Sequence, residues 1–285
     1  MDISTNNGTE MTGIASTHTS STACQRIPPD SRPVPPHTTS PTMRPATGEP
    51  GDSLEERRKL LDDVTHSIDA AADYWATRKE EFLWLAGELY LGFVDPAMFY
   101  GEEPFFEQDM FNLLFTEWTL FEFPFYKGLT PLQEYAAHPP VDASPQDVRW
   151  MREVMDAQFF SRFEIRHKEP ASGMTTLVDV CTSKRYDVFD EVLCNVDRWK
   201  SGTIAMRIAR VGDLWLHVGK VHLYDRAEAH FTAVDGPGAF HPEDRINKPW
   251  AEQAGFYLRL IRDLIGLDGR YRATTKLVST EWSDR

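Results

Sequence analysis

The sequence lacks the short motifs by which many enzymes are recognised. It has no P-loop, no G-x-G-x-x-G, no G-x-S-x-G and no H-E-x-x-H. Its three cysteines, Cys24, Cys181 and Cys194, have neither the spacing of a zinc site nor that of a disulfide framework. Such sparse cysteine is typical of proteins from a reducing cytoplasm. We therefore expect a cytoplasmic protein with no identifiable catalytic residue, metal ligand or cofactor.

Bulky apolar side chains are scarce in residues 1–52, which are rich in Ser, Thr, Pro and Gly. Such a segment cannot offset the entropy lost on ordering, so it is predicted to be a disordered tail. It has no apolar core of the kind found in secretory signals. The longest apolar stretch of the chain is interrupted by Asp109, Glu117 and Glu122, each of which would cost about 2.5–3.5 kcal/mol at a bilayer centre. A membrane span is therefore not expected.

Aromatic residues, in contrast, are concentrated in one place. Between Phe99 and Tyr126, 11 of the 28 residues are Phe, Tyr or Trp. Within this stretch, one face of a helix carries Phe111, Leu114, Phe115, Trp118, Phe121 and Phe125. Because aromatic side chains bury the most area, this helix is predicted to form the centre of the core. Pro124 is expected to end it.

A tight corner should follow the aromatic helix. Gly128 supplies a turn, Thr130 has the position of an N-cap, and Pro131 and Gln133 complete a capping box over a short helix to about Ala137. The two carboxylates of the aromatic stretch, Glu117 and Glu122, could have pKa values raised by burial. The preferred interpretation is structural, with each reaching solvent or an arginine.

The run FTEWTLFEFPFYKGLTPLQEY resembles a segment of uncharacterised bacterial proteins associated with the SEC-C motif. The matching residues are Phe115, Glu117, Trp118, Phe121, Gly128, Thr130, Pro131 and Leu132. The similarity extends over roughly residues 99–224 and implies a helical part joined to a small β part. The zinc-binding SEC-C cysteines are absent here, and the resemblance implies no activity. Glu117, Trp118, Glu122, Gly128, Thr130 and Pro131 are the candidate binding or structural motif.

Two further helical patterns flank the aromatic stretch. Ser53 and Glu56 form a capping box, and apolar residues from Leu61 to Leu89 keep helical spacing, either in one long helix or in two that break near Thr77. This helix is expected to lie on the aromatic centre. On one of its faces Asp62, His66, Asp69 and Asp73 could hold a metal, but a solvated face is the preferred interpretation. Ser144 and Pro145 begin another helix.

Short β-rich runs occupy residues 161–224 and predict five strands. The fold class expected is α+β, with a helical domain (53–160), a small SH3-like or OB-like barrel (161–224), and a connection with a C-terminal helix (225–285). That helix should run from Lys248 to Ile265, with Trp250 buried and with Arg259 and Arg262 able to dock on the acidic helical part. His217 and His222 are treated as one strand's residues, facing opposite sides unless a bulge intervenes.

Charge limits the partners. Residues 54–160 hold 21 acidic and 8 basic residues, a surface that repels phosphate. Residues 161–224 hold 10 basic and 8 acidic residues, so a weak nucleic-acid stripe could comprise Arg162, Arg166, Lys168, Arg207 and Arg210, with Tyr186 or Trp199 for stacking. The sequence thus favours a non-catalytic interaction or adaptor protein that binds another protein. A nucleic-acid regulator and a carboxylate-based enzyme or metal protein are the alternatives.

Overall fold

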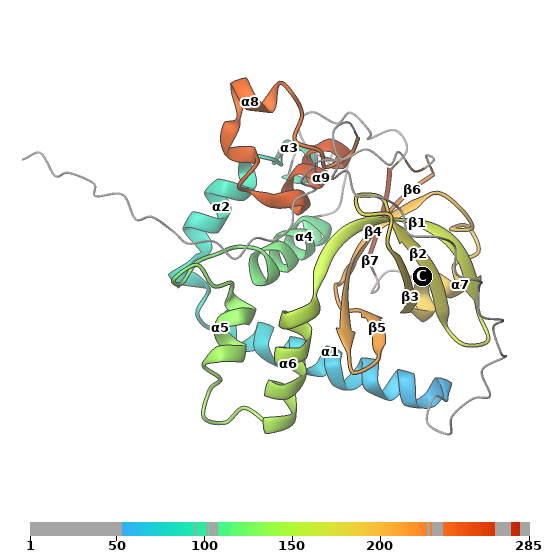
Figure 1. Ribbon diagram of the computed structural model, residues 1–285. Helices are drawn as coiled ribbons and strands as arrows, with labels where there is room; N and C mark the ends of the chain where they lie inside the picture. Colours follow the sequence, from blue (N-terminus) through green and yellow to red (C-terminus); the bar gives the residue numbers. More distant parts are fainter. Residues whose placement is uncertain are drawn as a thin grey trace, which may run out of the picture.

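The computed structural model describes residues 53–94, 96–100, 102, 108–226, 229, 236–265 and 275–279. The tail expected over residues 1–52 lies outside this range. Helices of the first half pack against a β-barrel formed by the second half (Figure 1). No helix among the described residues has both the length and the apolar composition needed to cross a bilayer. The expected α+β class, with a helical region before a barrel, is confirmed.

The first helix, α1 (Leu54–Ala76), begins at the predicted capping box. The Ser53 side chain accepts from the Glu56 N–H at 3.2 Å, and Glu56 accepts from the Ser53 N–H at 3.1 Å. The helix ends at Thr77, so the two-helix interpretation is correct. A 3-10 turn η1 (Lys79–Glu81) and helix α2 (Leu83–Leu91) follow. The predicted apolar stripe is wrong at Leu85, which is 59% exposed because the break rotates α2 relative to α1.

The aromatic helix lies at the centre of the helical region as expected. After the short α3 (Ala97–Tyr100), α4 spans Gln108–Phe121 and buries Leu114, Trp118 and Phe121. The Tyr90 ring of α2 meets Phe111 and Phe115 of α4 edge to face, and it contacts both Phe111 and Trp118 at 5.5 Å between centroids. Such pairs add to the stabilisation that comes from burial alone. The helix stops before Pro124, in line with the residue's lack of an N–H.

The corner and the next two helices also match the prediction. Lys127 and Gly128 have positive φ, and α5 (Pro131–Ala137) starts from the capping box of Thr130 and Gln133. Helix α6 (Pro145–Ala157) is capped by Ser144 and buries Val148, Met151 and Val154. It leads directly into the first strand.

Five strands close into a barrel: β1 (Phe159–Glu169), β2 (Met174–Asp179), β3 (Arg185–Phe189), β4 (Thr203–Val211) and β5 (Leu214–His217). Their order is β1-β2-β3-β5-β4, and β4 pairs back to β1. Strands β3 and β5 are parallel, and the short helix α7 (Glu191–Asn195) lies between β3 and β4. Of the two barrel types expected, this is the OB-like arrangement.

The last of the five predicted strands, which was expected to contain both His217 and His222, forms two strands in the structure. Strand β5 ends at His217, and β6 (Val221–Asp225) resumes on the same edge of β4 after three intervening residues. Strand β7 (Thr275–Ser279) then pairs with β6, so the barrel's sheet is extended to seven strands.

The C-terminal segment departs from the predicted single helix. It forms α8 (Asp244–Asn247), a 3-10 turn η2 (Pro249–Ala251) and α9 (Gly255–Ile265). Trp250 is 40% exposed rather than buried. Arg259 and Arg262, which were expected to dock on the acidic helices, make contacts within the C-terminal segment. Arg259 donates to backbone carbonyls of its own segment, and Arg262 pairs with Asp244 and Asp263.

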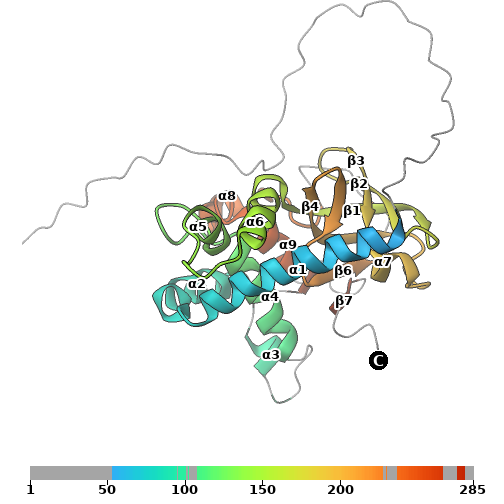
Figure 2. The ribbon, with the colours of Figure 1, turned by 90° about the horizontal axis from the view of Figure 1, so that it is seen from below.

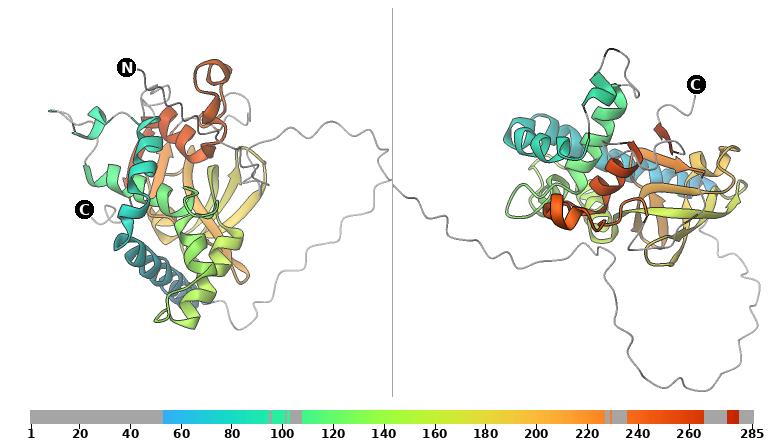
Figure 3. Two further views of the ribbon diagram at one scale, coloured as in Figure 1. Left: turned by 90° about the vertical axis from the view of Figure 1, so that its left-hand side faces the viewer. Right: turned by 90° about the horizontal axis from the view of Figure 1, so that it is seen from above.

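One continuous apolar cluster joins the helices to the outer face of the barrel. It includes Val64 of α1, Leu114 of α4, Leu258 of α9 and Val221 of β6. Figure 2 shows α1 running beneath both regions, and Figure 3 shows α9 between the helices and the barrel. The Tyr257 hydroxyl of α9 donates to the Leu114 carbonyl at 3.1 Å. A second, smaller cluster fills the barrel interior.

Candidate metal centre

An aspartate stands where β3 passes into α7. Asp190 is the N-cap of α7, and its Oδ1 accepts the Leu193 N–H at 2.9 Å. Capping fixes the side chain, because the first turn of a helix has N–H groups with no partner in the helix. The second oxygen, Oδ2, remains for other contacts. Asp190 follows Val188, a residue of the barrel interior, by two positions and therefore points to the same side.

Two histidines meet this carboxylate because the strand between them is bulged. From His217 to Leu223 the chain advances six residues, whereas their partners on β4, Ile208 and Ala205, are three residues apart. The β5–β6 side thus has three more residues than β4 over the same length. Because three is an odd number, side chains that would point to opposite faces in a regular strand point to the same face across the bulge. His217 and His222 therefore share one face, which is the exception that the prediction allowed for a bulge.

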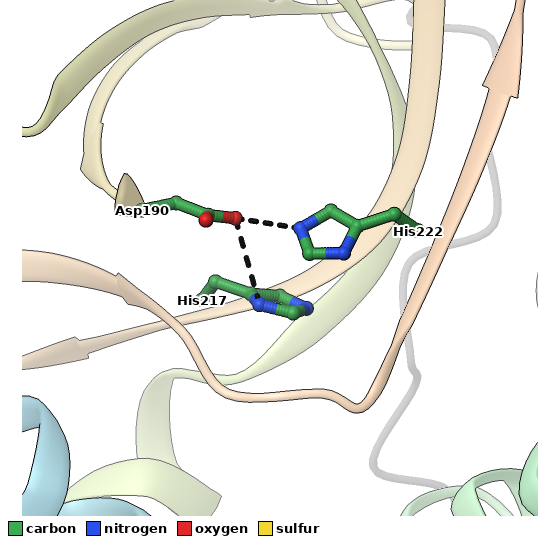
Figure 4. A group of neighbouring side chains, drawn as sticks. All are labelled: Asp190, His217 and His222. Atoms are coloured by element: carbon green, nitrogen blue, oxygen red, sulfur yellow. Dashed lines mark hydrogen bonds and ion pairs between the residues drawn. The ribbon is translucent and has the colours of Figure 1, made fainter. Parts of the chain in front are cut away.

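The three side chains converge inside the barrel (Figure 4). His222 Nε2 lies 2.7 Å from Asp190 Oδ2, and His217 Nδ1 lies 3.5 Å from the same oxygen. The two imidazole rings are 4.2 Å apart between centroids. Exposure is 3% for Asp190, 7% for His217 and 0% for His222. In the part of the chain that the structure describes, this is the one group whose ligand atoms all lie within 4.8 Å of one another.

Electrostatics keep His217 and Asp190 in protonation states that can bind a cation. Burial lowers the pKa of His217 to about 3, and the neighbouring His222 acts in the same direction against the opposing effect of Asp190. For Asp190, burial alone would raise the pKa, but the charge and hydrogen bond of His222 lower it below its ordinary value. At neutral pH His217 is thus a neutral imidazole and Asp190 a carboxylate. These are the protonation states that metal ligands require.

The spacing is close to that of a tetrahedral site. Ligand bonds of about 2.0–2.1 Å place neighbouring donor atoms about 3.3 Å apart. The separation of His217 Nδ1 from Asp190 Oδ2, 3.5 Å, is close to that value, whereas His222 Nε2 at 2.7 Å from the same oxygen would have to move back by about 0.6 Å. His217 Nε2 and His222 Nδ1 are buried and make no hydrogen bond among the described residues. Two imidazoles with one carboxylate are a donor set suited to Zn²⁺ or Fe²⁺.

The side chains of the motif singled out in the aromatic stretch are packed or paired within the fold. Glu117 is buried and pairs with Arg207, whose Nη1 also lies 2.8 Å from Glu122. Burial raises the pKa of Glu117, although Arg207 and a backbone N–H from Lys220 oppose this. Trp118 is a core ring, 1% exposed.

The turn residues of that motif hold the corner together. Gly128 has φ of 81°, Thr130 caps α5, and the Pro131 carbonyl accepts the Trp75 Nε1–H at 2.7 Å. None of them reaches the metal centre.

Two of the five arginines and lysines proposed for nucleic acid are not at the surface. Arg162 is 2% exposed and pairs with the buried Asp225, and Arg207 is 0% exposed on Glu117. A buried arginine paired with a carboxylate cannot contact a phosphate backbone. The predicted stripe is therefore wrong at these positions. Both arginines lie on the outer face of the barrel, opposite to interior neighbours such as Phe163 and Met206, and are buried there.

The other three are partly accessible. Arg166 and Arg210 each pair with a carboxylate within three residues, and Lys168 donates to the Val196 carbonyl at 2.9 Å. Trp199 is fully buried, so it offers no stacking surface. Tyr186 is partly buried in a ring cluster, with its centroid 4.9 Å from that of Trp215.

The acidic face of α1 does not gather ligands. Asp62, His66 and Asp73 are exposed, and Asp69 pairs with Lys220 Nζ at 3.0 Å. The interpretation as a solvated face agrees with this placement. Asp190, in contrast, escaped the sequence analysis. Its only signal was an Asp at a strand end followed by a short helical run, and Gly219 was the only sign of a bulge.

No protein-family model, curated protein or solved structure matches this chain. The resemblance to SEC-C-associated proteins stays a prediction. The function has to be argued from the residues of the chain itself.

Proposed function

We propose that this protein binds one divalent transition-metal ion inside its barrel, through Asp190, His217 and His222. The observation that carries the proposal is the convergence of two buried imidazoles, from β5 and β6, on one buried carboxylate oxygen inside the barrel. Buried polar groups are costly unless something compensates them. An ion would use all three groups together.

A hydrogen-bonded network without an ion accounts for part of the arrangement. Asp190 caps α7 and accepts from His222, which is a sufficient structural role for both. It accounts less fully for His217, whose Nδ1 lies 3.5 Å from an oxygen already used and whose other polar contact is with the backbone of Val221. The surplus histidine favours the metal proposal.

The burial of the ligands suggests what the ion does. All three are less than a tenth exposed, which does not suit an ion that must bind substrate. We assign it a structural role, which is to tie the end of β3 to the bulge between β5 and β6. This role is compatible with the non-catalytic interaction protein favoured by the sequence.

Metal analysis tests the proposal. The full chain, purified without chelator and dialysed, should carry close to one equivalent of a transition metal by elemental analysis, and the apoprotein should take up Zn²⁺ or Co²⁺. His217→Ala and His222→Ala should abolish this uptake. His66→Ala, which removes an exposed histidine of α1, should leave it unchanged. Wild-type apoprotein that takes up neither ion at micromolar concentration would contradict the proposal.

A second candidate is the protein-binding role expected from the sequence. Helix α2 leaves four apolar side chains at the surface: Trp84 is 73% exposed, Leu85 59%, Leu91 44% and Leu83 41%. Exposed apolar groups clustered on one short helix are typical of an interaction site. If the partner is a second copy of the chain, sedimentation should show a dimer that Trp84→Arg dissociates. A wild-type monomer at all concentrations would exclude self-association.

A further inference from the structure

The bulge that brings the histidines together is held from outside the barrel. Glu117 of α4 reaches the strand from the helical region, and its Oε2 accepts the Lys220 N–H at 2.7 Å. Lys220 lies between His217 and His222, in the three-residue segment that joins β5 to β6. A side chain of the central aromatic helix therefore sets the position of the segment between two of the proposed ligands.

Gly219 allows this close approach. A Cβ placed at Gly219 would be 2.9 Å from both carboxylate oxygens of Glu117 and 3.1 Å from the Arg207 Cβ. A side chain at this position would have to displace the Glu117 carboxylate. The carboxylate thus rests directly against the backbone of the bulge, on the side away from the barrel interior.

Arg207 holds the other end of the same segment. Its carbonyl accepts the Val218 N–H at 3.0 Å, and its Nε lies 3.4 Å from Glu117 Oε1. The guanidinium also lies over the Phe121 ring of α4, 4.5 Å from the centroid. Glu117 and Arg207 thus form one buried pair that accepts hydrogen bonds from the bulge, at the N–H groups of Lys220 and Val218 respectively.

We propose that Glu117 is the positioning residue of the metal centre and that it couples α4 to the ion. This inference rests on the proposed function. By holding the bulge in place, Glu117 maintains the change of register that brings His217 and His222 to the same face. Coupling between sites is reciprocal, so an ion bound at the histidines stabilises the contact of α4 with the barrel to the same extent.

The competing explanation is that Glu117 and Arg207 form a buried ion pair with a structural role alone. Substitution of Glu122 serves as a control that distinguishes the two explanations. Glu122 pairs with the same Arg207 at 2.8 Å, but the hydrogen bond to the bulge is made by Glu117. Removing either carboxylate perturbs the arginine. Of the two changes, only the loss of Glu117 should alter the metal centre.

The test is a Co²⁺ titration of full-length apoprotein, followed by the visible d–d spectrum, which reports the geometry around the ion. Glu117→Ala should weaken Co²⁺ binding by about 10- to 100-fold and change the spectrum, as loss of an outer-shell partner does. Glu117→Gln keeps an oxygen that can accept the Lys220 N–H, so it should restore much of the affinity. Glu122→Gln should leave affinity and spectrum at the wild-type values.

The outcomes are distinguishable. Wild-type protein that binds Co²⁺ with the same affinity and spectrum as Glu117→Ala overturns the inference and leaves the proposed function intact. Wild-type protein that binds no Co²⁺ overturns both. If Glu117→Ala does not fold, Gly219→Ala replaces it, because the added methyl displaces the carboxylate from the bulge. Unchanged Co²⁺ binding by that variant would equally refute the coupling.

Discussion

The buried His217 should make the apoprotein lose stability as the pH falls below neutrality. Its pKa in the folded chain is lowered from 6.5 to about 3, chiefly by burial. An unfolded chain therefore binds a proton at this residue below about pH 6.5, while the folded chain does not. The unfolded state gains protons relative to the native one, so acid favours unfolding. The loss begins near the ordinary histidine pKa and ends near the folded value.

The size of the effect follows from the linkage relation. Each pH unit within that window costs about 1.4 kcal/mol, so lowering the pH from about 7 to about 5 should remove about 2 kcal/mol of unfolding free energy. Asp190, whose pKa is lowered, contributes a loss of the same sign only below about pH 4. Between neutral and mildly acidic pH the effect of His217 can thus be read separately from that of Asp190.

Urea unfolding with a chelator present measures it, at the two pH values and with a fixed ionic strength. His217→Phe fills the same space without a titrating group and should lose about 2 kcal/mol less than wild type over this range. His66→Gln, at an exposed position, should behave as wild type. Equal pH dependence in wild type and His217→Phe would refute the reasoning, as would an NMR titration that places His217 near its ordinary pKa.

Three further outcomes are expected. Zn²⁺ at about 100 times its dissociation constant should stabilise the protein by about 2.7 kcal/mol, seen as a higher melting temperature that His222→Ala abolishes. Arg207→Met should destabilise by about 3–5 kcal/mol in urea, because Glu117 is left buried without its partner, and a double variant with Glu117→Met should recover part of the loss. Gly202→Ala should lower the free energy of unfolding by about 1–3 kcal/mol in the same urea assay, because φ is +100° and the new methyl would clash with the Asp225 carbonyl. A smaller change would mean that the backbone moves to relieve the clash.

Much of the helical region could be predicted because its signals are local. Capping boxes at Ser53 and Thr130, and the N-cap at Ser144, depend on residues within one turn, and each stands where the sequence placed it. The aromatic content of α4 determined its burial. The prediction was wrong at Leu85 and Trp250, where rotation after a break decides which side faces the core.

The cluster of Asp190, His217 and His222 could not be predicted, because its geometry depends on a bulge. The run from Leu214 to Tyr224 alternates like one strand, and a strand places His217 and His222 on opposite faces. The bulge is fixed by Glu117, about a hundred residues away in the chain, through a hydrogen bond to the backbone of Lys220. No local pattern contains such a contact.

Because the helices and the outer barrel face share one apolar cluster, no boundary between them divides the chain into fragments that keep their own cores. A fragment ending near Ala157 would leave Leu114 and its neighbours without a covering layer, and an isolated barrel would turn Val221 and Leu223 towards water. Because the two regions share one apolar cluster, we expect them to unfold together. A destabilising substitution in either region should therefore lower the free energy of unfolding of the whole chain.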